Sequence, residues 1–75
     1  MDAEAIRQEI QSFLKEDFIY KPEVEQSRLI AYLRSLDEGI EESTVISLLK
    51  DMAANKLFRL GKNEAGENVV LLPSY

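Results

Sequence analysis

Residues 40–72 read IEESTVISLLKDMAANKLFRLGKNEAGENVVLL, and the hydrophobic period of this segment changes once along its length. In residues 42–54 the apolar side chains share one helical sector: Val45, Leu48, Leu49 and Met52. Asn55 follows, and because asparagine tolerates the left-handed conformation, it is expected to end the helix. The runs 57–60 and 69–72 are short and β-prone. A polar loop of about eight residues with two glycines separates them, which predicts a β-hairpin.

Two further helices are expected upstream of this segment. Residues 2–16 carry an apolar stripe at helical spacing, and Asp2 stands where its carboxylate caps a first turn. Residues 23–36 return to the same period, and Gly39 is expected to end this helix in the left-handed conformation. The candidate core comes from all three helices: Ile6, Ile10, Phe13, Leu14, Leu29, Leu33, Leu36, Val45, Leu48, Leu49 and Met52.

The link between the first two helices is predicted to be a short strand or an extended link. Residues 17–21 bring two aromatic side chains and one β-branched side chain together, which favours extended backbone. Pro22 follows and biases Lys21 away from helix. The chain is therefore expected to form a single domain over residues 1–75, of the α+β class and mainly helical.

The composition of the 75 residues excludes several kinds of site. There is no Cys and no His, which removes disulfides, thiolate metal sites and the usual activated serine or thiol nucleophiles. Carboxylates stand in adjacent pairs such as Glu41-Glu42, and neighbours on a helix point apart rather than facing each other. No glycine-rich phosphate loop and no calcium-binding spacing is present. We therefore expect no enzyme activity, no cofactor and no metal ion.

The length of the apolar runs indicates where in the cell the protein is expected. The sequence opens MDAEAIRQEI, which is acidic and lacks the apolar run of a secretory signal. The longest purely apolar run, residues 69–72, is far shorter than the ~20 residues that a membrane span needs. The absence of Cys is consistent with a reducing compartment. We expect a cytoplasmic protein without a membrane partner.

The order of the expected elements resembles the winged helix-turn-helix superfamily. The closest local match is residues 40–72, where Ser-Thr-Val at 43–45 and Leu-Leu at 48–49 fit the third helix of that family. Residues 61–68 fit the tip of its wing, and residues 17–20 fit its small first strand. The resemblance covers nearly the whole chain and implies a three-helix winged helix-turn-helix with a C-terminal β-hairpin wing. An unrelated three-helix domain ending in a hairpin is the alternative.

The resemblance also implies a footprint on DNA. In that family the third helix enters the major groove, and the wing contacts the backbone or the minor groove. The implied contacts are Ser43, Thr44, Ser47 and Lys50 on the third helix, Arg59 and Lys62 on or near the wing, and Ser27 and Arg28 near the start of the second helix. The alternative roles are helix capping for the serine and threonine at 43–44 and ordinary solvated surface for the cations.

The charge balance predicts that DNA binding is weak. The chain has 9 basic and 14 acidic residues, a net charge of −5, and so repels phosphate at long range. No arginine lies on the third helix to make the common bidentate contact with guanine. A monomer is expected to bind duplex DNA weakly, and a dimer or a larger complex would strengthen the binding.

A protein–protein interaction module that binds no nucleic acid is the alternative function. Small side chains on the outward side of the third helix allow close approach of a partner, and an edge strand can accept another strand. The candidate contacts are Ile46, Ala54, Phe58 and Tyr75. The partner is then another protein or a second copy of the chain.

Overall fold

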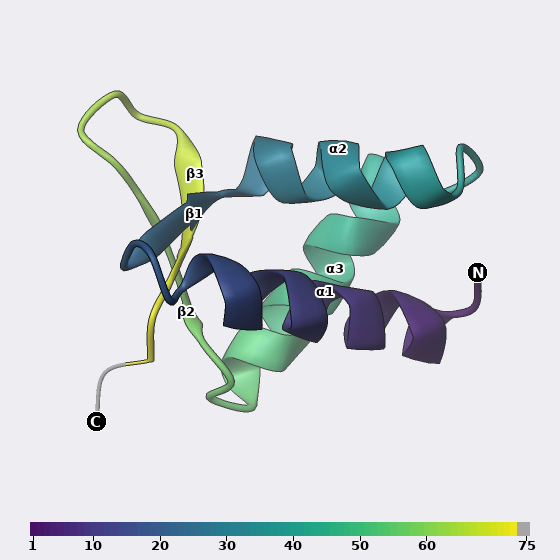
Figure 1. Cartoon of the computed structure of the whole chain (residues 1–75), viewed down its shortest axis with the longest axis horizontal. Helices are drawn as coiled ribbons and strands as arrows, with labels where there is room; N and C mark the ends of the chain where they lie inside the picture. Colours follow the sequence, from purple (N-terminus) through teal and green to yellow (C-terminus); the bar gives the residue numbers. More distant parts are fainter. Residues whose placement is uncertain (74–75) are drawn as a thin grey trace.

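The computed structural model, described here over residues 1–73, contains three helices and one three-stranded antiparallel sheet. The elements are α1 (Ala3–Asp17), β1 (Glu23–Glu25), α2 (Gln26–Leu36), α3 (Glu42–Ala54), β2 (Arg59–Lys62) and β3 (Asn68–Leu71). Helices α1 and α2 run side by side, α3 crosses behind them, and the β2–β3 hairpin stands at one end of the helices (Figure 1). The predicted fold class, mainly helical α+β with three helices and a C-terminal hairpin in the layout of a winged helix, is confirmed.

Helix α1 begins as the sequence predicts and ends later. The side chain of Asp2 caps it, with the Ala5 backbone N–H donating to Asp2 Oδ1 at 2.8 Å. The helix then continues to Asp17, and a turn follows in which the Phe18 N–H donates to the Leu14 carbonyl at 2.9 Å. The prediction of a strand over residues 17–21 is therefore wrong. Phe18 packs against the core from the end of the helix, and this tertiary contact outweighs its β-propensity.

The first strand lies in residues that were expected to begin the second helix. In β1, Val24 is only 1% exposed, while the glutamates on either side of it are exposed. The strand pairs with β3, so that Val24 stands opposite Val70, and the Leu72 N–H donates to the Pro22 carbonyl at 3.1 Å. Helix α2 starts after this strand, at Gln26.

Helices α2 and α3 end at the predicted residues, Leu36 and Ala54, but the way in which each end is capped differs from expectation. Asp37 closes α2 in extended conformation, and its Oδ1 accepts the Gly39 N–H at 2.9 Å. The Met1 ammonium group donates to Asp37 Oδ2 at 2.6 Å; this bond and the Gly39 N–H hold the pKa of Asp37 below its ordinary value. Asn55 has φ −88°, and the left-handed residue after α3 is Lys56 at φ 64°. After α2, the bond from the Gly39 N–H to the Asp37 side chain replaces the left-handed glycine that was expected. After α3, the left-handed residue is present but lies one position later than expected, at Lys56.

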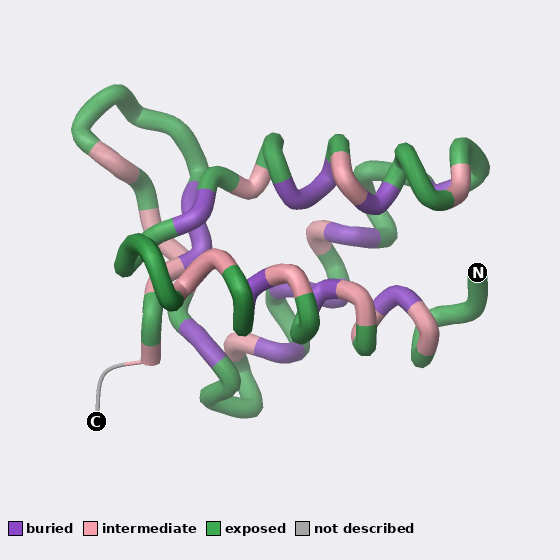
Figure 2. The backbone as a smooth tube through the Cα atoms, in the orientation of Figure 1, coloured by how far each residue is buried: buried purple, intermediate pink, exposed green. Residues whose placement is uncertain are grey.

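The core is a single cluster on the facing sides of the helices and the sheet (Figure 2). Its buried members are Ile6, Ile10, Leu14, Val24, Leu29, Ile30, Leu33, Ile40, Val45, Leu48, Leu49, Met52, Phe58 and Val70. Of the side chains predicted for the core, Leu36 is 48% exposed, because it is the last residue of α2 and lies beyond the contacting turns. Phe13 packs against the cluster while only half-buried.

The hairpin has strands of the predicted length, both shifted toward the tip, and a shorter loop than the sequence predicts. Residues 63–67 connect β2 to β3, with Gly66 in the left-handed region at φ 81°. The Glu67 N–H donates to Asn63 Oδ1 at 2.9 Å, and Asn63 Nδ2 donates to Glu67 Oε1 at 3.1 Å. The loop is thus closed by hydrogen bonds between Asn63 and Glu67 at its two ends.

The contrast between Leu33, which is fully buried, and Leu36 gives a direct test of this packing. Leu33→Ala is expected to cost about 2–5 kcal/mol, a large part of the roughly 4–11 kcal/mol that a chain of this size has. Leu36→Ala should cost under about 1 kcal/mol. Urea denaturation of both variants measures the difference. Equal losses would show that Leu36 belongs to the core after all.

Candidate functional site

A hollow of about 430 Å³ lies between α3 and the β2–β3 hairpin. The residues that line it are Gln26, Ile46, Lys50, Leu60, Gly61, Lys62 and Asn68. They come from the start of α2, one side of α3, and both strands of the hairpin. The hollow is therefore built from two of the three strands and two of the three helices.

Local geometry explains why these side chains meet. Ile46 and Lys50 are four residues apart on α3 and so lie on one face of the helix, one turn apart. Leu60 and Lys62 alternate with their neighbours along β2 and so point to one face of the sheet. Ile46 and Leu60 are half-buried and pack against the core. The hollow thus has an apolar floor, with the two lysines beside it.

Every polar side chain that lines the hollow carries N–H donors, and none of them is a carboxylate. These side chains are Gln26, Lys50, Lys62 and Asn68. Gln26 Nε2 donates to the Val69 carbonyl at 3.2 Å, which ties the start of α2 to β3. In a chain with 14 acidic residues, this local set of donors can receive an anionic group.

The outer face of α3 continues from this hollow. Ser43, Ser47, Lys50 and Ala54 are exposed at helical spacing along it. Thr44 lies on another flank of α3, where it lines a separate hollow with Met1, Ile6 and residues of the α2–α3 turn. The structure therefore places three of the four helix residues implied for DNA contact on one face and separates Thr44 from them.

The remaining residues implied for DNA contact are not brought to the hollow. Arg59 lies three positions before Lys62 on β2 and so points to the opposite face of the sheet. Its Nε donates to the Leu72 carbonyl at 3.0 Å. Arg28 forms an ion pair with Asp17 and lies 5.3 Å from the centre of the Phe13 ring, so its guanidinium group is held between α1 and α2. Ser27 is exposed at the start of α2 and does not line the hollow.

The candidate contacts for a protein partner are also not all brought to the hollow. Ile46 lines the hollow, and Ala54 is exposed at the end of α3. Phe58 is only 4% exposed and belongs to the core, so the expectation that it offers a surface to a partner is corrected. The burial follows from the direction of the chain as it enters β2, which turns this ring inward. Tyr75 lies outside the described residues.

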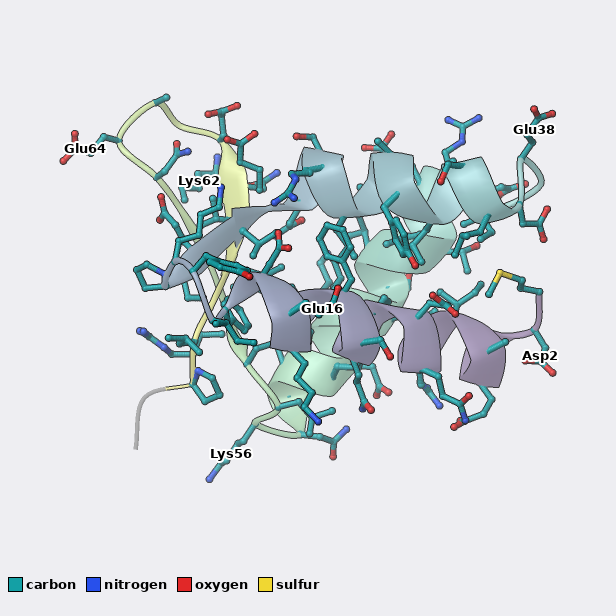
Figure 3. All side chains as sticks on the ribbon, in the orientation of Figure 1. Asp2, Glu16, Glu38, Lys56, Lys62 and Glu64 are labelled. Carbon is teal, nitrogen blue, oxygen red and sulfur yellow. The ribbon has the colours of Figure 1, made fainter. Side chains whose placement is uncertain are left out.

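Opposite charges lie close together where β2 meets the hairpin loop: Lys62 is the last residue of β2 and lines a further hollow with Glu23 and Glu64. Lys62 lies on the arm near the helices, whereas Glu64 points away from the helices at the outer end (Figure 3). Glu67 is also exposed in this loop. A long anionic ligand that follows the hairpin outward would therefore meet carboxylates at the tip.

Sequence reasoning missed four residues of the hollow, namely Gln26, Leu60, Gly61 and Asn68. Leu60 could have been found only if the predicted strand had been extended through Lys62, because residues two apart on a strand share a face. Asn68 could have been found only with the register that pairs it with Lys62. Gln26 gives no signal in the sequence, because its position depends on the pairing of β1 with β3.

A second hollow lies on the other side of the molecule, between α1 and α2, and is lined by Phe13, Lys15, Ile19 and Tyr32 among others. The Phe13 and Tyr32 rings are tilted at 34° with their centroids 4.8 Å apart. Tyr32 donates its hydroxyl to Glu9 Oε2 at 2.9 Å, and this bond, together with partial burial, raises the pKa of Tyr32 above its ordinary value.

Within residues 1–73, no cluster of three or more acidic side chains is arranged to hold a metal ion. The helices of this part of the chain are all too short or too polar to span a membrane. Comparison of the chain with protein-family models, with curated proteins and with solved structures finds no match.

The Tyr32–Glu9 bond has a consequence for pH dependence. Because folding raises the pKa of Tyr32, the neutral phenol is favoured in the native state, and this part of the stability is present below pH ~10 and lost as the pH rises through the native pKa. Glu9→Gln removes the charged acceptor and should lower the pKa of Tyr32. Ultraviolet titration of the native protein measures this, with Tyr32→Phe identifying the signal. An unchanged titration of Glu9→Gln would contradict the assignment.

Proposed function

We propose that this chain is a non-catalytic, DNA-binding module of the winged-helix type, which acts in transcription regulation and binds duplex DNA weakly as a monomer. The observation that supports it best is the hollow between α3 and the hairpin, whose polar side chains are all N–H donors. Lys50 and Lys62, on two different elements, meet at this one place. A backbone phosphate is the anionic group that such a hollow would hold on DNA.

The outer face of α3 supplies the second half of the proposed contact. With a phosphate in the hollow, the adjoining face that carries Ser43 and Ser47 would point toward base edges. A serine hydroxyl both donates and accepts, and so reads several bases. We therefore expect the position on the duplex to be set by Lys50 and Lys62, with little preference for sequence.

Charge limits the affinity that this contact can reach. Two lysines release few counterions, whereas tight DNA binding rests on roughly 6–10 phosphate contacts. Glu64 and Glu67 at the tip of the hairpin oppose an extended contact along the backbone. We infer a dissociation constant of about 10⁻⁴ M or weaker for a monomer at physiological salt. A second copy or a larger complex would add the missing contacts.

A protein-interaction role without nucleic acid is the second candidate, and the floor of the same hollow favours it. Ile46 and Leu60 offer apolar surface beside an edge strand, and the net charge of −5 does not oppose a protein ligand. The two functions differ in what they require of α3. DNA binding requires the charge of Lys50, whereas a protein partner requires the apolar surface of Ile46.

Titration of the isotope-labelled chain with mixed-sequence duplex DNA, followed by amide NMR, tests the lead proposal. At low salt, shifts should concentrate in residues 43–50 and 59–62 and vanish at high salt. Lys50→Glu and Lys62→Glu should each weaken binding about tenfold or more and reduce the slope of log affinity against log salt by about one. Lys15→Glu makes the same change of charge on α1, away from the hollow, and serves as the matched control.

Two results would contradict the proposal. The first is the absence of shifts at millimolar duplex in low salt. The second is an equal loss in all three variants, which would mean that only the net charge of the chain matters. In either case the protein-interaction role becomes the lead, and partners should be captured with the intact domain and compared with those of Ile46→Ser.

A further inference from the structure

Strand β2 has one unpaired edge. The sheet order is β1–β3–β2, so β3 is central and covers only one side of β2. On the other side of β3, the Leu72 N–H donates to the Pro22 carbonyl, which fixes alternate residues of β3 to face β1. The remaining residues of β3 face β2, as the bond from Asn63 N–H to the Glu67 carbonyl at 3.0 Å confirms at the end of the ladder.

This alternation determines which groups of β2 face outward. Residues 59, 61 and 63 turn their N–H and C=O groups toward β3, through the register that pairs Gly61 with Val69. The backbone groups of Leu60 and Lys62 therefore face away from the sheet. In the described part of the chain, no loop or helix forms a backbone hydrogen bond with these two residues.

The same two residues present their side chains to the hollow. Leu60 forms part of its apolar floor with Ile46, and Lys62 lies beside the floor together with Lys50. A free row of backbone donors and acceptors thus runs directly along a hollow with an apolar floor and cationic sides. These are the two features that recognition by strand addition uses, namely backbone pairing and alternate side-chain pockets.

The charges on β2 oppose pairing with a second copy of itself. Its exposed side chains are Arg59 and Lys62. Arg59 and Lys62 point to opposite faces of the sheet, but antiparallel pairing of two β2 strands through this edge would set the two Lys62 side chains opposite or diagonal to each other, and like charges in cross-strand positions are destabilising. A lysine on an edge strand is also a common means of preventing such self-pairing. The occupant that this edge favours is therefore an acidic segment.

We propose that the free edge of β2 binds an extended acidic segment of another protein as a fourth strand of the sheet. In this arrangement an apolar residue of the segment lies opposite Leu60 and covers Ile46. A carboxylate two positions away lies opposite Lys62, because residues two apart on a strand share a face. A second carboxylate on the other side of the apolar residue is within the reach of the Lys50 side chain.

This inference shares the hollow with the proposed DNA contact but does not rest on it. Both ligands use Lys62, so they exclude one another from the site. Only the peptide needs the backbone of β2 and the apolar floor. An acidic segment bound in this way would displace DNA and so act as its competitor.

The test uses a peptide probe that alternates serine with the recognised residues, acetyl-Ser-Glu-Ser-Val-Ser-Glu-Ser-amide. Added to the isotope-labelled full chain, it should shift the amides of Leu60 and Lys62 most and slow their exchange with solvent, because these groups become hydrogen-bonded. A peptide of the same sequence with N-methyl groups on the pairing edge cannot form the ladder and should not bind.

Charge exchange identifies the cationic side of the site. Lys62→Glu should weaken binding of the acidic peptide about tenfold, whereas Lys15→Glu should leave it unchanged. A probe with lysine in place of only the glutamate that faces position 62, which keeps the carboxylate near Lys50, should regain affinity for Lys62→Glu, and a merely structural effect of the substitution would not produce this recovery. Ile46→Ser tests the apolar floor and should weaken the binding of both probes to their matching chains.

Several results would overturn the inference. These are equal binding of the N-methylated peptide, unchanged exchange of the Leu60 and Lys62 amides at saturation, or equal affinity of the acidic peptide for Lys62→Glu. A parallel titration with duplex DNA separates the two proposals. If the peptide binds and DNA does not, the DNA-binding role fails and the inference stands; if DNA binds and the peptide does not, the inference fails and the DNA-binding role stands.

Discussion

The pairing of β1 with β3 is the contact on which the rest of this structure depends. Three residues of β1 lie more than forty positions from their partners in β3, and at their centre Val24 faces Val70, both almost fully buried. A hairpin alone is marginal in water, whereas a third strand and a helical face make a sheet stable. This one pairing therefore joins the hairpin to the helices and converts two local structures into one cooperative domain.

The same pairing positions the candidate site. Because β1 runs directly into α2, the first residue of that helix, Gln26, is carried beside β3, where it bonds to the Val69 carbonyl. Helix α3 approaches the hairpin from the other side and brings Lys50 near Lys62. The hollow is a consequence of how the sheet is joined to the helices and does not exist in any one element.

This explains why the helices and the hairpin could be predicted from the sequence and the first strand could not. A helical stripe and a β-prone run are local patterns, so residues 42–54 and the hairpin are readable directly. The strand β1 is stabilised by partners far along the chain, and its own sequence, Glu-Val-Glu, continues the helical pattern that follows. Residues 17–21 have the stronger β-propensity, but Phe18 is anchored to the core at the end of α1. Propensity fails here because a non-local pairing and a local anchor both act against it.

The candidate site residues also divide into those that local sequence patterns indicate and those that depend on tertiary packing. Ile46, Lys50 and Lys62 could be named from the sequence, since exposure on a helix face or a strand follows from the period, but they were assigned to two different functions. The structure brings all three to one hollow. Arg28 could not be excluded from the sequence, because its ion pair with Asp17 requires the packing of α1 against α2.

Charge distribution gives the last constraint on any ligand. The described ion pairs neutralise carboxylates on the helical side, as Arg7 does with Asp51 at 3.0 Å, and none of them involves Lys50 or Lys62. Lys62 also lines a neighbouring hollow with Glu23 and Glu64, so these carboxylates reduce the attraction that Lys62 offers to an anion. A ligand that extends further meets Glu64 and Glu67 at the tip of the hairpin. The surface therefore favours a short anionic contact over a long one, whether the anion is a single phosphate or the carboxylates of an added strand.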